Sequence, residues 1–238
     1  MMTEELFRED AALLTCEATV TGQGEGGVTL DRTVCYPLGG GQAGDTGWLV
    51  AGEQRWRVTD TRKSKETPGA IVHLVEGDPP AVGLVVRVEV DAARRQAHRR
   101  FHTATHLLCA LLPYPVDGCS ITDTYARLDF HTDEPFDKHA IEVGLARLVA
   151  EAHPVRHRWI SEEELDANPG LVRSMSVQPP RGLGRVRVLE VEGVDLQPCG
   201  GTHVSNTAEI GALVVTKIEK KSAKTRRVVL GFAQSSGA

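Results

Sequence analysis

The pattern of apolar and polar positions changes character near residue 90. Before that point, short runs of apolar and β-branched residues alternate with turns that contain Gly or Pro, and no helical period interrupts them. These expected strands cover residues 13–20, 28–35, 48–50, 55–59, 70–75 and 84–90. Many short strands separated by turns are typical of a small β-barrel or sandwich. Residues 1–90 are therefore predicted to form a Gly-rich β-barrel domain.

From Asp91 onward, helical segments alternate with strand-like ones. The run that follows Asp91, a suitable N-cap, contains no Gly or Pro and stops at Pro113. Further helices are expected over 136–152 and from Ser161, where Glu164 completes a capping box. The expected strands are 124–130, 155–160, 185–191, 212–218 and 226–232. This alternation predicts an α+β domain over residues 91–238.

Two pairs of metal-binding side chains lie far apart in this second segment. His102 and His106 occur in Phe-His-Thr-Ala-Thr-His-Leu-Leu, on the expected helix, where residues four apart share one face. Cys199 and His203 occur in Pro-Cys-Gly-Gly-Thr-His, where the two glycines favour a tight turn after a strand. Either pair alone is weak support for a metal. Together they supply three imidazoles and one thiol, which predicts a shared tetrahedral Zn²⁺ site.

Three motifs carry a resemblance to a known family. They are His-Thr-Ala-Thr-His-Leu-Leu, Cys-Gly-Gly-Thr-His-Val followed by Glu-Ile-Gly, and Tyr-Pro-Leu-Gly-Gly-Gly-Gln-Ala-Gly-Asp-Thr-Gly at residues 36–47. In this order they resemble the editing region of alanyl-tRNA synthetases, and still more the free-standing AlaX alanyl-tRNA editing proteins. The resemblance covers nearly the whole chain. It implies a β-barrel followed by a zinc-containing editing domain of the threonyl/alanyl-tRNA synthetase second additional domain type.

The same resemblance implies a reaction. A pocket built for alanine rejects serine, which adds only a hydroxyl, by about a hundredfold, so a second, hydrolytic site becomes necessary. The expected activity is a zinc-dependent aminoacyl-tRNA deacylase that cleaves Ser-tRNA(Ala), with Gly-tRNA(Ala) as a second candidate substrate. No segment resembles an ATP-binding aminoacylation module, so we expect action in trans on the acceptor end of tRNA(Ala). Two alternatives stay open: an RNA-binding adaptor with a purely structural zinc, and a zinc hydrolase of another ester.

The ligand count leaves the role of the metal open. Four protein ligands fill a tetrahedral shell, which is typical of a structural zinc site. Catalysis then requires a fifth ligand, a weakly held protein ligand, or a metal that organises the pocket while a ribose hydroxyl or an ordered water assists. The residues alone do not choose among these.

Other side chains near these motifs are candidates for substrate recognition or for support of the ligands. The glycines of Gly39–Gln42 by themselves predict a turn, whereas the resemblance implies a loop over the pocket that presents Gln42. Thr103 and Thr105 can recognise a seryl hydroxyl or bond within the helix. Gln197 can hydrogen-bond a metal ligand. Where synthetase editing domains often carry a Gln before a turn, the expected turn here is Val116-Asp117-Gly118 and has Val116 instead.

The charge distribution favours RNA despite an acidic balance. The chain has 27 Lys and Arg against 32 Asp and Glu, a net charge of -5. Positive charge nevertheless gathers in two segments, which can bind phosphates without reading sequence and can also be ordinary solvated surfaces. The candidate RNA-binding residues are Arg94, Arg95, Arg99 and Arg100 on the expected helix, and Lys220, Lys221, Lys224 and Arg226 near the C-terminus.

The N-terminal residues and the cysteines indicate the compartment. The first ten residues are acidic and lack the basic and apolar regions of a signal peptide, and no apolar run is long enough to span a bilayer. Outside the metal pairs, the scattered Cys16, Cys35, Cys109 and Cys119 are expected to be reduced thiols. A cytoplasmic protein without a membrane partner is predicted, and no obligate protein partner is inferred.

Overall fold

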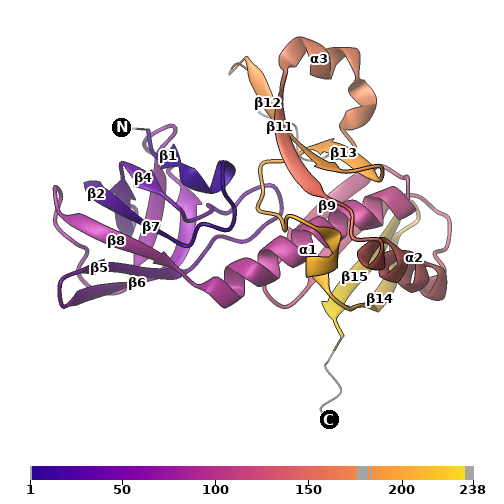
Figure 1. The fold of residues 1–238 in the computed structure, drawn as a ribbon, viewed down its shortest axis with the longest axis horizontal. Coiled ribbons are helices and arrows are strands. Elements are labelled where there is room, and N and C mark those ends of the chain that lie inside the picture. The colour runs from indigo at the N-terminus through magenta and orange to yellow at the C-terminus, as the bar shows by residue number, and fades with distance from the viewer. Residues whose placement is uncertain (1, 176–181, 183, 234–238) are drawn as a thin grey trace. The chain divides into compact units, whose positions relative to one another are not determined.

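The computed structural model describes residues 2–175, 182 and 184–233, and it divides into two compact units (Figure 1). The first unit is Met1–His98 and the second is Arg99–Ala238. The division falls inside one helix, α1 (Ala92–Leu111), which therefore belongs to both units. Within the described residues, no helix has the length and apolar character needed to cross a membrane.

The first unit is built around a closed β-barrel. Its strands pair in the order β2-β3-β7-β6-β5-β8, and every pair is antiparallel. They are β2 (Thr15–Gly24), β3 (Gly27–Leu30), β5 (Gly47–Ala51), β6 (Gln54–Lys63), β7 (Ile71–Val75) and β8 (Val85–Val90). Alternate side chains, among them Val28, Leu49 and Val88, fill the interior. Closure leaves no unpaired sheet edge, and the predicted barrel is confirmed.

Short elements and a tight turn complete this unit. Strands β1 (Glu4–Glu5) and β4 (Arg32–Thr33) pair in parallel, and the 3-10 helix η1 (Leu6–Arg8) places Phe7 against Tyr36. Gly39 and Gln42 exchange two backbone hydrogen bonds of 3.1 and 3.0 Å around Gly40 and Gly41. Both central residues have positive φ, 59° and 85°, which only glycine adopts readily. The Gly-rich segment is thus a two-residue turn.

A buried ion pair connects the segment after this turn to the first residues of α1. The Asp45 carboxylate accepts hydrogen bonds from the Tyr36 N–H, at 2.6 Å, and from the Arg95 guanidinium, and Arg95 also donates to the Val34 carbonyl. Asp45 and Arg95 are 0% and 1% exposed. Burial raises the pKa of Asp45, but the charge and hydrogen bonds of Arg95, the nearby His98 ring and the Tyr36 N–H outweigh it and lower that pKa overall. The pair is therefore charged in the folded protein.

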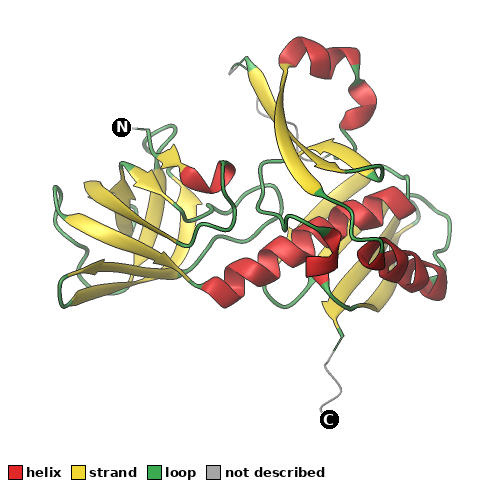
Figure 2. Ribbon diagram, viewed as in Figure 1, coloured by secondary structure: helices red, strands yellow, loops and turns green. Residues whose placement is uncertain are grey.

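Among its described residues, the second unit contains two antiparallel sheets and two α-helices besides α1 (Figures 1 and 2). The larger sheet has the order β14-β15-β10-β9, from β14 (Leu213–Ser222), β15 (Thr225–Phe232), β10 (Ala126–His131) and β9 (Val116–Ile121). The smaller sheet has the order β11-β12-β13, from β11 (Val155–Ser161), β12 (Arg185–Val191) and β13 (Asp195–Pro198). The predicted α+β arrangement is confirmed.

One face of the larger sheet is buried beneath α1 and α2 (Lys138–Ala150). Phe101, Leu107 and Leu108 of α1 pack with Leu128 and Leu230 of the sheet, and all five are at most 3% exposed. Burial of apolar surface contributes about 25 cal/mol per Å², so this cluster stabilises the packing of α1 on the sheet. It also fixes the orientation of α1.

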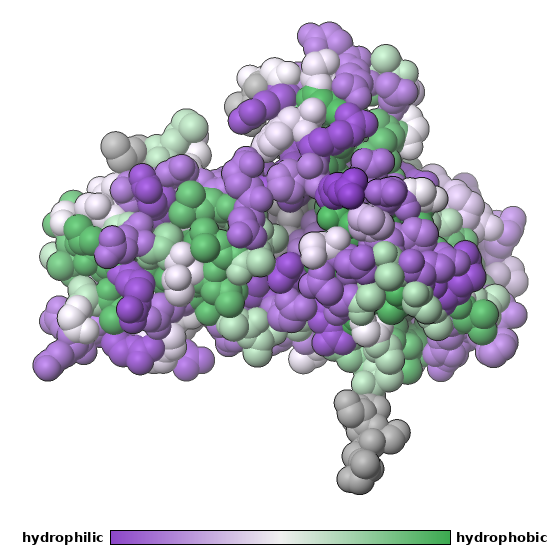
Figure 3. Space-filling model, viewed as in Figure 1, coloured by the Kyte–Doolittle hydropathy of each residue, from purple (hydrophilic) through white to green (hydrophobic). Residues whose placement is uncertain are grey.

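The smaller sheet has its own apolar cluster. Ile160, Leu165 and Val188 pack together where α3 (Glu162–Ala167) and the 3-10 helix η2 (Pro169–Leu171) follow β11. Hydrophilic side chains predominate over α3 and β11 in the view of Figure 3. The Ser161 hydroxyl accepts a hydrogen bond from the Glu164 N–H, so the predicted helix start at Ser161 is confirmed.

In the described part of the second unit, strands β9 and β13 differ from the sequence predictions. Val116, Asp117 and Gly118 were expected to form a turn, but they begin β9, which pairs with β10 across a bulge at Asp129/Phe130. The turn prediction was wrong because long-range pairing overrides the low strand propensity of Asp and Gly. Strand β13 was not predicted at all. A third 3-10 helix, η3 (Thr207–Ile210), starts at the Asn206 capping box.

Candidate metal centre

Four side chains that can bind a metal converge in the second unit. His102 and His106 come from successive turns of α1, and Cys199 and His203 come from the loop between β13 and η3. One ligand atom from each side chain lies within 4.8 Å of all the others. The three histidines are buried and Cys199 is half-buried. The helix and loop halves expected from the sequence therefore meet at one point.

The separations are close to those around a small tetrahedral ion. The Cys199 Sγ atom lies 3.1 Å from His203 Nε2 and 3.4 Å from His102 Nε2. Zinc–nitrogen and zinc–sulfur bonds of about 2.0–2.3 Å in a tetrahedron place neighbouring donors about 3.3–3.8 Å apart. Three imidazoles and a thiol are also the donor types that zinc prefers. The residues present therefore fit a zinc ion.

A carboxylate orients one of the histidine ligands through the ring nitrogen that does not face the cluster. The Asp195 Oδ2 atom, on β13, lies 2.7 Å from His106 Nδ1, so the ring presents Nε2 to the cluster. The Gln197 side chain donates to both carboxylate oxygens of Asp195, at 3.0 and 2.9 Å. A carboxylate behind a histidine ligand orients the ring and raises its basicity. Gln197, a candidate for a hydrogen bond that supports a metal ligand, bonds to Asp195, the residue that orients His106.

A hydroxyl holds a second ligand. Thr103 Oγ1 lies 3.2 Å from His203 Nδ1 and donates to the Arg99 carbonyl at 2.9 Å. The Val204 N–H also donates to this hydroxyl, at 3.3 Å. Because the hydroxyl proton is directed to Arg99, the His203 Nδ1–H is the donor toward Thr103. The free Nε2 atom of His203 then faces the cluster, as metal binding requires.

Two arginines fix the loop that carries Cys199 and His203. Arg187 of β12, which is buried, donates to the carbonyls of Cys199 and Gly201 at 2.8 and 3.3 Å, and its own carbonyl accepts from the Cys199 N–H. From α1, the Arg99 Nε–H donates to the His203 carbonyl at 2.8 Å. Charge-assisted hydrogen bonds of this kind are the stronger ones in proteins. The ligand loop is therefore held at both ends.

The thiol of Cys199 is set up as a thiolate. Burial raises its pKa, but electrostatic interactions with His102 and His203 and hydrogen bonds from His102 and His106 outweigh that effect. The resulting pKa lies well below the usual value for cysteine. The thiolate is the form that binds metal.

The remaining substrate-recognition candidates have internal partners. The Thr105 hydroxyl donates to the His102 carbonyl at 2.7 Å, one of the two roles that the sequence left open for it. Thr103 takes part in the hydrogen bonds to Arg99 and His203 described above. Gln42 lies in the first unit, where its backbone closes the Gly39–Gln42 turn and its side chain is buried.

The basic candidates divide by exposure. Arg95 and Arg226 are at most 9% exposed, and both bond to groups of the protein itself. Arg100 donates to the Ile210 carbonyl and lies over the Phe232 ring, 3.8 Å from its centroid. Arg94 and Arg99 are half-buried, whereas Lys220, Lys221 and Lys224 are exposed on the hairpin of β14 and β15. The exposed cations of this set are therefore the three hairpin lysines.

Sequence reasoning missed Asp195 and Arg187. A signal for Asp195 was present, since Asp195, Gln197 and Cys199 alternate along one chain segment and alternate residues of a strand share a face. No local pattern marks Arg187, because its partners follow it by 12 and 14 residues and are reached only through the pairing of β12 with β13.

Comparisons with known proteins place this chain among tRNA synthetase and alanyl-tRNA editing sequences. The model of the threonyl and alanyl tRNA synthetase second additional domain matches residues 186–229, and that of class II (A) tRNA synthetases matches residues 9–94. The alanyl-tRNA editing protein AlaX-M of Methanosarcina mazei is 34% identical over 254 residues, covering 99% of both chains. AlaX-M of Methanosarcina barkeri is also 34% identical, covering 95% of this chain and 98% of its own.

Longer relatives match over part of their length. The alanine–tRNA ligase of Archaeoglobus fulgidus is 34% identical over 228 residues, which cover 91% of this chain and 24% of the ligase. The chain thus spans about a quarter of the ligases that it matches. With two AlaX-M proteins matched from end to end, the resemblance predicted from the sequence motifs is confirmed, and the chain belongs to the family of alanyl-tRNA editing proteins AlaX-M.

Proposed function

We propose that this protein is a trans-editing deacylase that hydrolyses the ester of Ser-tRNA(Ala) at a zinc site formed by His102, His106, Cys199 and His203. The observation that carries the proposal is the convergence of these four donors in a chain that AlaX-M proteins match over their whole length. Gly-tRNA(Ala) is the second candidate substrate. We further propose residues 1–90 and 91–238 as the two domains, because β8 ends at Val90 and α1 follows it.

Zinc bound here would polarise the ester carbonyl or lower the pKa of a water molecule toward about 7. The protein's own residues prepare that chemistry. Asp195 holds the His106 ring, Thr103 holds the His203 ring, and Arg187 and Arg99 hold the loop between the ligands. Preorganised ligands of this kind need no rearrangement when substrate arrives.

Substrate recognition rests on candidates with different support. Gln42, Thr103 and Thr105 remain candidates for contact with the amino acid, and Gln197 supports the site through Asp195. For RNA binding we retain the half-buried Arg94, Arg99 and Arg100 and the exposed Lys220, Lys221 and Lys224. We leave out Arg95 and Arg226, because each is buried against groups of the protein.

Deacylation of mischarged tRNA tests the proposal directly. Purified protein loaded with zinc should release serine from Ser-tRNA(Ala) and leave Ala-tRNA(Ala) largely intact, with Gly-tRNA(Ala) and Thr-tRNA measured in parallel. The variant Gln42→Ala should deacylate more slowly with its zinc content unchanged, and unchanged turnover would remove Gln42 from the site.

The alternatives give different results in the same assay. An adaptor with a structural zinc would bind tRNA(Ala) without turnover. A zinc hydrolase of another ester would cleave free seryl esters as fast as seryl-tRNA. Either result would reject the editing proposal.

A further inference from the structure

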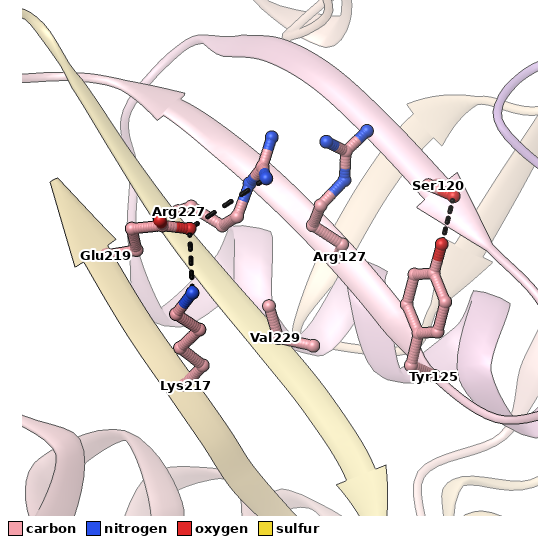
Figure 4. Close-up of a pocket in the computed structure, with 7 residues that line it drawn as sticks. All are labelled: Ser120, Tyr125, Arg127, Lys217, Glu219, Arg227 and Val229. Carbon is pink, nitrogen blue, oxygen red and sulfur yellow. Dashed lines mark hydrogen bonds and ion pairs between the residues drawn. The ribbon is translucent and has the colours of Figure 1, made fainter. Parts of the chain in front are cut away.

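A pocket of about 400 Å³ lies on the larger sheet of the second unit (Figure 4). None of its lining residues is a candidate metal ligand or belongs to the elements that carry those ligands. Its lining side chains come from all four strands and from the turn between β9 and β10. In the strand register, Ser120, Arg127, Val229 and Lys217 form one row across the sheet. The side chains of this row stand on the face opposite Leu128 and Leu230, which are buried under the helices.

The charges of this pocket favour an anion. Arg127, Lys217 and Arg227 line it together with a single carboxylate, Glu219. A second carboxylate, Asp129, lies beside it, so that cations outnumber carboxylates in a chain with a net charge of -5. A local excess of positive charge in an acidic protein marks a place where phosphate is attracted.

The three cations differ in how strongly the protein already binds them. Arg227 makes two hydrogen bonds to Asp129, at 2.7 and 2.8 Å, so its charge is largely neutralised. Arg127 makes one ion pair of 3.4 Å with the same Asp129, and its buried Nε atom has no hydrogen-bond partner among the described residues. Lys217 pairs with Glu219 at 3.3 Å, and its side chain is 59% exposed. Arg127 and Lys217 are therefore the cations best able to bind a ligand.

An aromatic ring lies beside these cations. Tyr125 is 38% exposed, and its hydroxyl lies 3.3 Å from Ser120 Oγ, which holds the ring at the edge of the pocket (Figure 4). Val229 lies between Arg127 and Lys217 and provides an apolar floor. Aromatic rings stack on nucleic acid bases of any sequence, while neighbouring cations bind the backbone phosphates.

We propose that this pocket binds single-stranded RNA, with a base stacked on Tyr125 and backbone phosphates bound by Arg127 and Lys217. One intervening strand separates these two cations, so their backbones are about 10 Å apart, and their long side chains can reach adjacent phosphates. Lys220, Lys221 and Lys224 extend the positive charge along the same hairpin, which favours a polymer over a mononucleotide. The inference rests on the proposed function, because the RNA bound here would be an unpaired stretch of the tRNA substrate outside its reacting end.

Binding of a labelled eight-nucleotide single-stranded RNA, followed by fluorescence anisotropy at several salt concentrations, tests the site in the full chain. Tyr125→Ala should weaken binding about tenfold, whereas Tyr125→Phe should stay within about twofold, because stacking needs the ring and not the hydroxyl. Arg127→Ala and Lys217→Ala should each reduce the slope of log K against log salt by about 0.7, the value for one phosphate contact.

Arg156→Ala is the matched control. It removes one positive charge from a residue 71% exposed on β11 of the smaller sheet, and it should leave both affinity and salt slope unchanged. The proposal is overturned if the Tyr125, Arg127 and Lys217 variants bind like Arg156→Ala, or if Tyr125→Phe binds as weakly as Tyr125→Ala. Thermal unfolding of each variant identifies losses that come from misfolding.

Hydrolysis of seryl-adenosine, a substrate too short to reach the pocket, separates this inference from the proposed function. Tyr125→Ala and Arg127→Ala should hydrolyse it at the parent rate. If the parent protein hydrolyses neither seryl-adenosine nor seryl-tRNA, the editing proposal fails. If RNA binding still depends on Tyr125 and Arg127 in that case, the RNA site stands.

Discussion

The contact between Asp195 and His106 predicts how strongly the metal centre depends on a residue outside its ligands. Asp195→Asn keeps the size of the side chain and removes its negative charge, next to His106 Nδ1 at 2.7 Å. The His106 ring then loses its charge-assisted hydrogen bond and part of its basicity. Replacement of such supporting carboxylates lowers metal affinity by about 10- to 100-fold.

The magnitude at this site should lie within that range. The side chain of Asp195 is fully buried, so solvent does not screen its interaction with His106. A 10- to 100-fold loss corresponds to about 1.4–2.7 kcal/mol of binding free energy, in line with about 1.5–3 kcal/mol for one charge-assisted hydrogen bond. The three other ligands remain in place, so binding should weaken and not disappear.

Competition with a chelator of known affinity, at constant pH, measures the zinc dissociation constant. Glu192→Gln is the matched control, since it makes a comparable change to an exposed carboxylate that pairs with Arg156 at 3.3 Å. Its zinc affinity should equal that of the parent protein. If Asp195→Asn binds zinc as tightly as Glu192→Gln, the hypothesis that the Asp195 carboxylate strengthens metal binding through His106 is wrong.

Three further predictions concern the barrel unit. Burial of His73 lowers its pKa from 6.5 to about 4, so the unfolded chain takes up the proton at a higher pH than the folded protein does. The contribution of His73 to stability is therefore full above pH 6.5 and declines by up to about 3 kcal/mol toward pH 4. Urea unfolding of His73→Gln across this pH range should lack that part of the decline. Asp45→Ala leaves Arg95 buried without a counter-ion and should lower the free energy of unfolding by about 3–5 kcal/mol. The double variant Asp45→Ala/Arg95→Met should recover most of this loss, whereas a loss equal to the sum of the two single variants would contradict the explanation. In Gly47→Ala the new Cβ would lie 1.9 Å from the Glu89 carbonyl oxygen, and thermal unfolding should show that stability falls by about 1–3 kcal/mol. The control Gly170→Ala should keep the parent stability, because no atom lies near the position of its new Cβ.

Elements that carry their own boundary signals were predicted closely from the sequence. The Asp91 carboxylate accepts from the Arg94 N–H at 3.0 Å, and α1 ends two residues before Pro113, so a cap and a helix breaker sufficed to place the helix. The barrel strands follow the alternation of apolar and polar residues. In contrast, β13 has only four residues and ends in Pro198, and it exists because β12 offers backbone partners to it.

In the candidate site, too, some residues could be predicted from local sequence patterns and others could not. Helical spacing was enough to place His102 and His106 on one face, and the two glycines were enough to predict a loop for Cys199 and His203. The alternation of Asp195 with Cys199 was a signal for Asp195, but its pairing with His106 was not predictable, since 89 residues separate them and only the tertiary fold brings β13 to α1. Likewise, the sequence grouped Arg226 with its exposed neighbours, although β-strand alternation turns its side chain toward the Asp133 carbonyl.

The sequence separation of the two ligand pairs would give a bound metal ion a role in folding. His102 and Cys199 are 97 residues apart, and a zinc ion held by both would act as a reversible cross-link that closes a loop of that length. In the chain-entropy description, closing a loop of about 100 residues in the unfolded state removes about 4.7 kcal/mol of conformational freedom. A contribution of that size is a large fraction of the stability of an ordinary domain. The concentration of zinc would then set how much of this protein is folded, through a single ion.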